Sequence, residues 1–321
     1  MPASGGPGAA SAVQTQPGAP GWWRLEMACP PELEESLLWK LQSLGIPRVA
    51  LRHPPQTPQQ RELLAWLPDI DWPEEQRLAL QMALAPLGEP FGLALPPLLW
   101  QHQSDEDWSL SWKQHWQADP VGERLLILPA WLELPQEYDQ RLVIRMDPGS
   151  AFGTGSHPTT RLCLEALEGL AGAGTGLSGL RVADLGCGSG VLGLAALRLG
   201  AASVTATDID SLSVRASGDN ARLNDLSLTV AQGSVEALAQ LLGERPADLL
   251  LCNILAPVIE AMAPAFNQVL AADGLGLLSG LLVDQAPSLI KALAAAGWSA
   301  ELTARQAPWG LLTIRRNGTV T

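Results

Sequence analysis

The chain has 321 residues, 47% of them hydrophobic, and a formal net charge of −13. A chain of this length can bury a sizeable core and is long enough for two domains. The excess of acids argues against a nucleic-acid groove as the main surface, since phosphate binding needs clustered Lys and Arg. The sequence has neither an apolar run of about twenty residues nor a basic, apolar leader. We therefore expect a cytoplasmic protein without a membrane segment or a signal peptide, and one that does not require nucleic acid.

The first hundred residues predict a leader followed by a small α+β domain. Residues 1–20 are mostly Pro, Gly, Ala and Ser, and we expect them to be disordered. Hydrophobic patterning over residues 21–100 then predicts the order β-α-β-β-α-β, which is typical of a ferredoxin-like domain. The expected strands are 22–28, 48–52, 62–67 and 91–95, and the expected helices are 31–44 and 73–87.

Residues 101–120 are expected to form a helical linker. Trp108, Trp112 and Trp116 recur every fourth residue, which places them along one face of a helix. The acidic residues 105–107 favour a helix that begins there. Such a stripe can dock a partner, but packing against a neighbouring domain is the favoured interpretation.

The segment 147–160, Asp-Pro-Gly-Ser-Ala-Phe-Gly-Thr-Gly-Ser-His-Pro-Thr-Thr, predicts a glycine-rich loop before a helix. Ser156 is expected to cap that helix, with Pro158 in its first turn. Capping does not explain an aromatic residue among the glycines. We expect Phe152 to lie in a flexible lid over a cofactor pocket, with the hydroxyl of Thr160 pointing inward. A catalytic role for His157 stays open beside the favoured structural one.

From residue 121 onward the pattern predicts a second, larger α/β domain. Strands are expected at 121–128 and 141–146, and from residue 180 strands alternate with helices. That alternation is typical of a doubly wound sheet. The last two strands follow each other without a helix and predict an antiparallel hairpin at one edge, which nicotinamide-binding domains normally lack. The expected strands of the sheet are 180–185, 203–207, 228–231, 248–252, 274–279, 298–304 and 310–315.

The segment 182–190, Val-Ala-Asp-Leu-Gly-Cys-Gly-Ser-Gly, predicts a strand, a tight turn and a helix. Gly186 and Gly188 allow the backbone to approach a ligand closely. The next strand is expected to end at Asp208, where a carboxylate can bind a ribose diol. These features fit a nicotinamide site as well, because residues 188–193 match the G-x-G-x-x-G fingerprint.

Two further residues favour S-adenosylmethionine as the cofactor. Asp184 precedes the glycine turn, where an acid suits a ligand with an ammonium and a sulfonium and would repel a pyrophosphate. The apolar run 248–252 stops at Asn253, and ligands of open α/β sheets bind beyond the carboxyl ends of the strands. We expect Asn253 to face the reactive end of the cofactor, and a helix N-cap is its alternative role.

Together these segments resemble the bacterial ribosomal protein L11 methyltransferases, the PrmA family. The resemblance covers most of the chain from about residue 105, and its most specific mark is the segment 147–160. Further marks are Asp-Leu-Gly-Cys-Gly-Ser-Gly at 184–190, Thr-Asp-Ile-Asp at 207–210 and Asn-Ile-Leu-Ala at 253–256.

The resemblance implies a class I methyltransferase fold that uses S-adenosylmethionine, with a front domain that recognises ribosomal protein L11. It also implies that the counterparts of four residues bind the cofactor: Thr160, Gly186, Asp208 and Asn253. The expected domain boundaries are 21–100 for substrate recognition and 121–321 for the methyltransferase, and a monomer is expected. The cysteines predict neither a metal site nor disulfides.

Asn253 is the candidate catalytic residue. Its side-chain oxygen and the carbonyls of Ile254 and Leu255 could accept N–H bonds from an amine and aim its lone pair, which is a proximity effect. The family modifies lysine side chains and the N-terminal amine of its substrate. The alternatives are a methyltransferase of another substrate, a nicotinamide oxidoreductase and a non-catalytic ribosome-binding protein.

Overall fold

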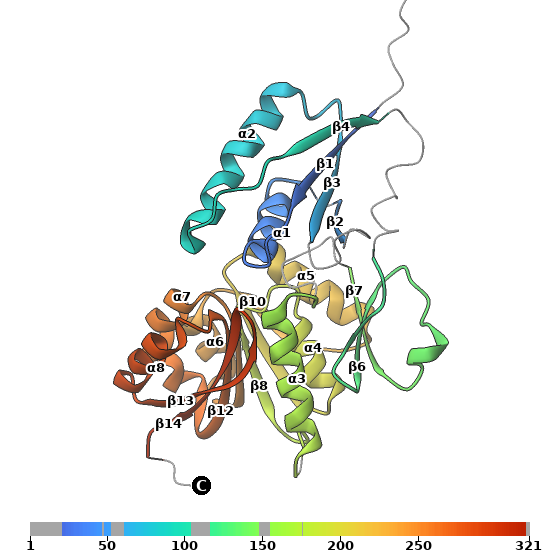
Figure 1. Ribbon diagram of the computed structural model, residues 1–321. Coiled ribbons are helices and arrows are strands. Elements are labelled where there is room, and N and C mark those ends of the chain that lie inside the picture. Colours follow the sequence, from blue (N-terminus) through green and yellow to red (C-terminus); the bar gives the residue numbers. More distant parts are fainter. Residues whose placement is uncertain are drawn as a thin grey trace, which may run out of the picture.

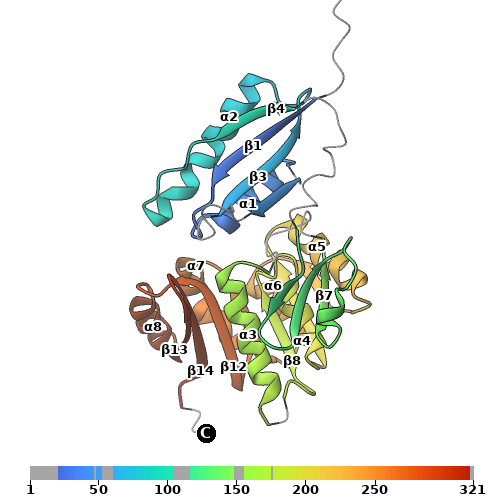
Figure 2. The same cartoon turned by 45° about the vertical axis from the view of Figure 1, so that its right-hand side comes forward.

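The computed structural model describes residues 21–46, 48–52, 61–103, 116–147, 155–174 and 176–318. These residues form a four-stranded, a three-stranded and a seven-stranded sheet. Figures 1 and 2 show that the four-stranded sheet and its helices lie at one end of the molecule, facing the larger part.

The front sheet has the strand order β2-β3-β1-β4, and all its neighbouring strands are antiparallel. Alternate residues of the strands, such as Leu25, Met27 and Leu63, pack with leucines of both helices into one core. This is the ferredoxin-like arrangement that the sequence predicted. Its elements are β1 (Trp22–Ala28), α1 (Glu34–Ser43), β2 (Val49–Arg52), β3 (Glu62–Pro68), α2 (Glu74–Leu84) and β4 (Leu99–Gln103).

The last strand of the front sheet was placed wrongly at 91–95. Phe91 instead ends the 3-10 helix η1 (Ala85–Phe91), and Gly92 follows in a left-handed conformation with φ of 64°. The chain then passes Pro96 and Pro97, which lack the N–H that a sheet ladder needs, before β4 begins. The front sheet therefore extends to residue 103, past the expected domain boundary at 100.

Most of the expected linker helix, including Trp108 and Trp112, lies outside the described residues. Trp116 is described and belongs to no helix or strand. Its indole Nε1–H donates to the carbonyl of Val49 at 3.3 Å, and its ring packs against the far face of the front sheet beside Trp66. For Trp116 the packing interpretation is confirmed.

The three-stranded sheet joins the front sheet to the larger one. Its strands are β5 (Asp119–Val121), β6 (Leu125–Pro129) and β7 (Leu142–Met146). β5 pairs antiparallel and β7 parallel with the fully buried β6. The single strand expected at 121–128 is thus two strands, separated by a turn in which Gly122 has φ of 52°.

The large sheet has the order β10-β9-β8-β11-β12-β14-β13, with β10 through β12 parallel and β14 antiparallel to both its neighbours. The doubly wound sheet with a terminal hairpin is therefore confirmed. Its strands are β8 (Arg181–Leu185), β9 (Ser203–Asp208), β10 (Thr229–Gln232), β11 (Ala247–Asn253), β12 (Leu270–Leu282), β13 (Trp298–Gln306) and β14 (Trp309–Arg316).

Helices cover both faces of this sheet, and each face has its own buried cluster. The first cluster joins the sheet to α3 (Pro158–Gly172) and α4 (Val191–Arg198), with α5 (Ser211–Leu223) at its margin. The second lies under α6 (Val235–Leu242), α7 (Ala256–Met262) and α8 (Ala286–Ala295). No described helix has the length and apolar character needed to cross a membrane.

Candidate functional site

The carboxyl ends of the parallel strands open onto a cavity of about 430 Å³, a size typical of small-molecule sites. Gly186 after β8, Asp208 at the end of β9 and Asn253 at the end of β11 all line it. Ser234, which follows β10, and Gly280, which lies in β12, also line the cavity. The opposite wall comes from the front part of the chain: Glu32, Glu35, Ser36, Trp39, Leu87 and Phe91.

Asp208 holds the glycine turn in place. Its Oδ2 accepts from the N–H of Gly188 at 2.8 Å and its Oδ1 from the N–H of Asp210 at 2.9 Å. Burial raises the pKa of this carboxyl, while the two backbone donors oppose that effect. Each carboxylate oxygen can accept more than one hydrogen bond, so Asp208 retains capacity to bind a diol.

The position of Gly186 in the turn after β8 has no space for a side chain. Its φ is 73°, and a Cβ placed on it would lie 2.6 Å from Cγ2 of Ile254. Ile254 follows directly on Asn253, so the turn after β8 has no room for a side chain beside the end of β11. Gly186 is among the residues that line the cavity.

Asp184 and Gly188 support the turn from behind and are not among the residues that line the cavity. Oδ2 of Asp184 accepts from the N–H of Gly193 in α4 at 3.0 Å, and its Oδ1 has no hydrogen-bond partner among the described residues. Burial raises the pKa of Asp184 to about 7. In this structure its visible role is therefore to hold the first turn of α4.

Asn253 is arranged as an acceptor in the cavity wall. Its Nδ2 donates to Oγ1 of Thr160 at 3.2 Å. Its Oδ1 is buried and has no hydrogen-bond partner among the described residues. The alternative role as a helix cap is wrong, because α7 is capped at Leu255, without a side-chain hydrogen bond. A buried acceptor without a partner at the edge of a cavity is a position prepared for a ligand donor.

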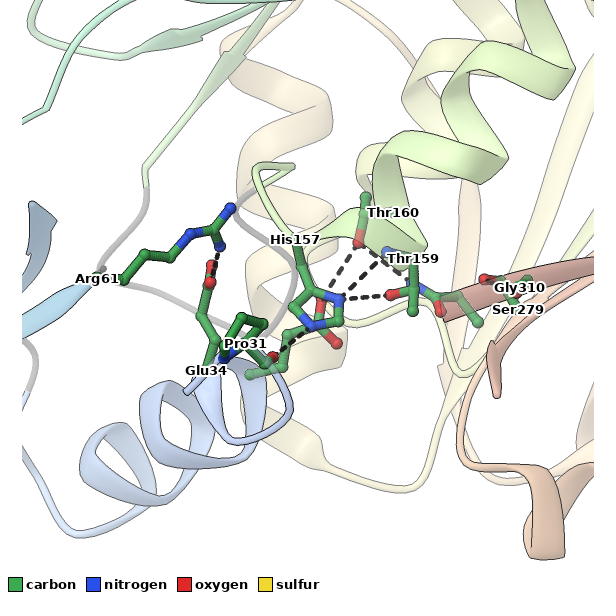
Figure 3. A network of polar contacts seen from close by, with 10 residues as sticks. Pro31, Glu34, Arg61, His157, Thr159, Thr160, Ser279 and Gly310 are labelled. Carbon is green, nitrogen blue, oxygen red and sulfur yellow. Dashed lines mark hydrogen bonds and ion pairs between the residues drawn. The ribbon is translucent and has the colours of Figure 1, made fainter. Parts of the chain in front are cut away.

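His157, not Ser156, caps α3, so the expected cap was one residue off. The N–H of Thr159 donates to Nδ1 of His157 at 3.3 Å, and Nε2 lies 3.0 Å from the carbonyl of Pro31 (Figure 3). Because a carbonyl only accepts, Nε2 carries the proton. Burial lowers the pKa of His157, and the ring packs edge-on against Trp309. His157 is thus a neutral residue that joins α3 to the front part of the chain.

The segment before α1 and the first turn of α1 complete the site, and sequence reasoning missed them. Oγ1 of Thr160 donates to Oε1 of Glu35 at 3.2 Å, and burial raises the pKa of Glu35 to about 8. The neighbouring Glu34 forms an ion pair with Arg61, which directly precedes β3 (Figure 3). Glu35 and Thr160 are 125 residues apart, so no local pattern connects them.

The predicted lid, the cysteines and possible metal ligands contribute nothing to the site as the structure describes it. Phe152 and the rest of the expected lid, residues 148–154, lie outside the described residues. All four cysteine thiols are free and buried. Nowhere in the described part of the chain do three His, Cys, Asp or Glu side chains gather as metal ligands would.

Comparison with known proteins gives one consistent result. The family model described as Ribosomal protein L11 methyltransferase (PrmA) matches residues 21–317. The ribosomal protein L11 methyltransferase of Synechococcus sp. (strain RCC307) is 62% identical over 299 residues, covering 92% of this chain and 98% of that protein. The corresponding protein of Parasynechococcus marenigrum (strain WH8102) is 64% identical over 294 residues, covering 90% and 100%.

Among solved structures, the ribosomal protein L11 methylase from Lactobacillus delbrueckii subsp. bulgaricus is similar to this chain. It is 35% identical, with a TM-score of 0.55, and the match covers 63% of this chain and 99% of that one. The resemblance expected from the segments at 147–160, 184–190 and 253–256 is thereby confirmed. The chain belongs to the ribosomal protein L11 methyltransferase (PrmA) family.

Proposed function

We propose that this protein transfers methyl groups from S-adenosylmethionine to amino groups of ribosomal protein L11. Family membership supports the reaction and the substrate. The observation that carries the proposal is the cavity at the carboxyl edge of the sheet, in whose wall Oδ1 of Asn253 is an acceptor without a partner among the described residues. An amine that approaches this wall brings the N–H donors that such an oxygen needs.

The residues that line the cavity fit the cofactor. Asp208 would accept from the ribose hydroxyls, and the backbone of Gly186 leaves the space that a Cβ would occupy. We assign Thr160, Gly188, Asp184 and Phe152 to the cofactor site as well, the first three as supports of its walls. The bound cofactor supplies the methyl group and a neutral thioether as the leaving group.

Asn253 acts as the catalytic residue by orienting the amine. Its Oδ1 accepts one N–H of the neutral amine, so that the nitrogen lone pair points along the line of displacement. A lysine amine, with an ordinary pKa near 10.4, must first lose a proton, whereas an N-terminal amine, near 7.7–8.0, loses it readily. Both classes of amine are the proposed methyl acceptors.

The front domain, residues 21–100 with β4 extending to 103, is assigned to substrate recognition. The chain carries a net charge of −13, which suits a basic partner such as a ribosomal protein. Helix α1 of the front domain contributes to the wall of the cavity, so a substrate held by this domain is delivered next to the cofactor. We further propose that the protein is a cytoplasmic monomer that requires neither a nucleic acid nor a membrane.

Mass spectrometry of purified ribosomal protein L11, incubated with the enzyme and S-adenosylmethionine, tests the proposal. We expect mass gains in steps of one methylene, with fragmentation locating the modified amines. Asn253→Ala should lower turnover on the order of 100-fold, because the amine loses its orienting acceptor. If the wild-type enzyme binds the cofactor in calorimetry but adds no mass to L11, the substrate assignment is refuted.

A further inference from the structure

A chain of two hydrogen bonds runs from the front domain to Asn253. Nδ2 of Asn253 donates to Oγ1 of Thr160, and Oγ1 of Thr160 donates to Oε1 of Glu35, both at 3.2 Å. Thr160 is 1% exposed, so water does not compete for its hydroxyl. The three residues lie on β11, α3 and α1, and the chain forms only where α1 is seated against the cavity.

The chemistry of these groups sets the direction of both bonds. An ionised carboxylate only accepts, and a hydroxyl has a single proton to donate. While Glu35 is ionised, the Thr160 hydroxyl must therefore donate its hydrogen bond to Glu35, and its oxygen accepts from an N–H of Asn253. This leaves Nδ2 of Asn253 occupied and Oδ1 without a partner in the described structure. The orientation of the amide thus follows from the charge of Glu35.

We propose that Glu35 is a positioning residue, which acts through Thr160 to turn the oxygen of Asn253 toward the substrate amine. This inference rests on the proposed function. When Glu35 is protonated, or is replaced by a neutral side chain, the Thr160 hydroxyl is free to donate to Oδ1 of Asn253 instead. The amide of Asn253 can then rotate by half a turn and present an NH₂ group, which cannot accept an N–H from the amine.

The surroundings of Glu35 allow its charge to change near neutral pH. Burial raises its pKa to about 8, and no Lys or Arg in the described residues forms an ion pair with it. The groups that face it are the unprotonated Nδ1 of His157 at 3.4 Å, the thiol of Cys163, and Glu34 and Glu32 from its own segment. A substrate ammonium that enters the cavity favours the charged carboxylate and so the productive orientation of the amide.

The isosteric variant Glu35→Gln tests this role. A Gln amide both donates and accepts, so it no longer dictates the direction of the bond to Thr160. We expect kcat for methylation of L11 to fall on the order of 10- to 100-fold, with the affinity for S-adenosylhomocysteine in calorimetry unchanged. Glu244→Gln, the same change at an exposed site after α6, should leave both values at the wild-type level.

A double-mutant cycle shows whether Glu35 acts through the hydroxyl. Thr160→Val removes the hydroxyl, so adding Glu35→Gln to it should cause no further loss of kcat, whereas Thr160→Ser should keep most of the activity. Wild-type kcat in Glu35→Gln, or losses that multiply in the double variant, would overturn the inference. Either result leaves the proposed function intact, because the wild-type enzyme still methylates L11.

A spectroscopic measurement tests the positioning without any methyl transfer. The side-chain amide signals of Asn253 in nuclear magnetic resonance, assigned by their loss in Asn253→Ala, should shift in the wild-type protein as pH passes through about 8. In Glu35→Gln this shift should be absent. If it persists, the charge of Glu35 does not control the amide, whatever the substrate of the enzyme proves to be.

Discussion

Gly186→Ala is the substitution whose cost the structure defines best. An L-residue held at φ of 73° costs about 1–2 kcal/mol. The added Cβ would also lie 2.6 Å from Cγ2 of Ile254, and the β-branched Ile254 cannot rotate freely out of the way. Forcing a methyl into such packing costs about 1–3 kcal/mol, which brings the total to roughly 2–5 kcal/mol.

Gly179→Ala is the matched control. Gly179 has φ of 80°, and a Cβ on it meets no atom within 4 Å. It should therefore show the backbone cost of about 1–2 kcal/mol alone. For a domain of this size each kcal/mol lowers Tm by about 2–4 °C, so the two variants should separate clearly in a thermal unfolding experiment.

The binding assay follows from the position of Ile254 beside Asn253. A Cβ on Gly186 displaces Ile254, and with it the wall of the cavity, so Gly186→Ala should weaken the binding of S-adenosylhomocysteine in calorimetry. Gly179→Ala should bind it as the wild type does. Equal Tm values and equal affinities for the two variants would refute the reasoning, because the contact with Ile254 would then have no energetic weight.

Three further variants test other contacts. The raised pKa of Asp184 means that the folded state keeps a proton that the unfolded chain releases between pH 3.8 and about 7. Stability should therefore fall as pH rises through this window, and Asp184→Asn should flatten that slope in urea unfolding. Trp298→Phe removes the indole hydrogen bond to the carbonyl of Ala263 at 2.9 Å and should cost about 1–3 kcal/mol in denaturant titrations. His157→Phe keeps an aromatic ring but loses the cap of α3 and the bond to the front domain. It should cost about 1–2 kcal/mol and enlarge the radius of gyration in solution scattering.

The order of the elements could be read from the sequence because local patterns determine it. Asp208 and Asn253 each end a predicted strand, and the parallel sheet brings these strand ends to one edge. Gly186 was identified by the tight turn that follows β8, and its positive φ agrees with that reasoning. These features depend on chain segments of ten residues or fewer and on general rules of sheet topology.

The remaining features depend on contacts between distant segments. β4 was missed because the run at 91–95 has more apolar residues than Leu99–Gln103, although prolines separate it from the sheet. Glu35 was missed because its neighbours in sequence form an ordinary helix start, and only tertiary packing brings it to Thr160. His157 took the role of cap from Ser156 since its ring also meets Pro31, which lies 126 residues away.

The position of β14 has a consequence for how the enzyme is made. This strand, the last of the described strands, lies between β12 and β13 rather than at the rim of the sheet. Its first residue, Trp309, also packs against His157 and against Phe91 of the front domain. During translation the large sheet cannot be completed until β14 has left the ribosome. The contact of Trp309 with the front domain cannot form before then either. The closed cavity therefore forms only after residues 309–316 have been synthesised, because Trp309 lines the cavity and contacts both of its walls.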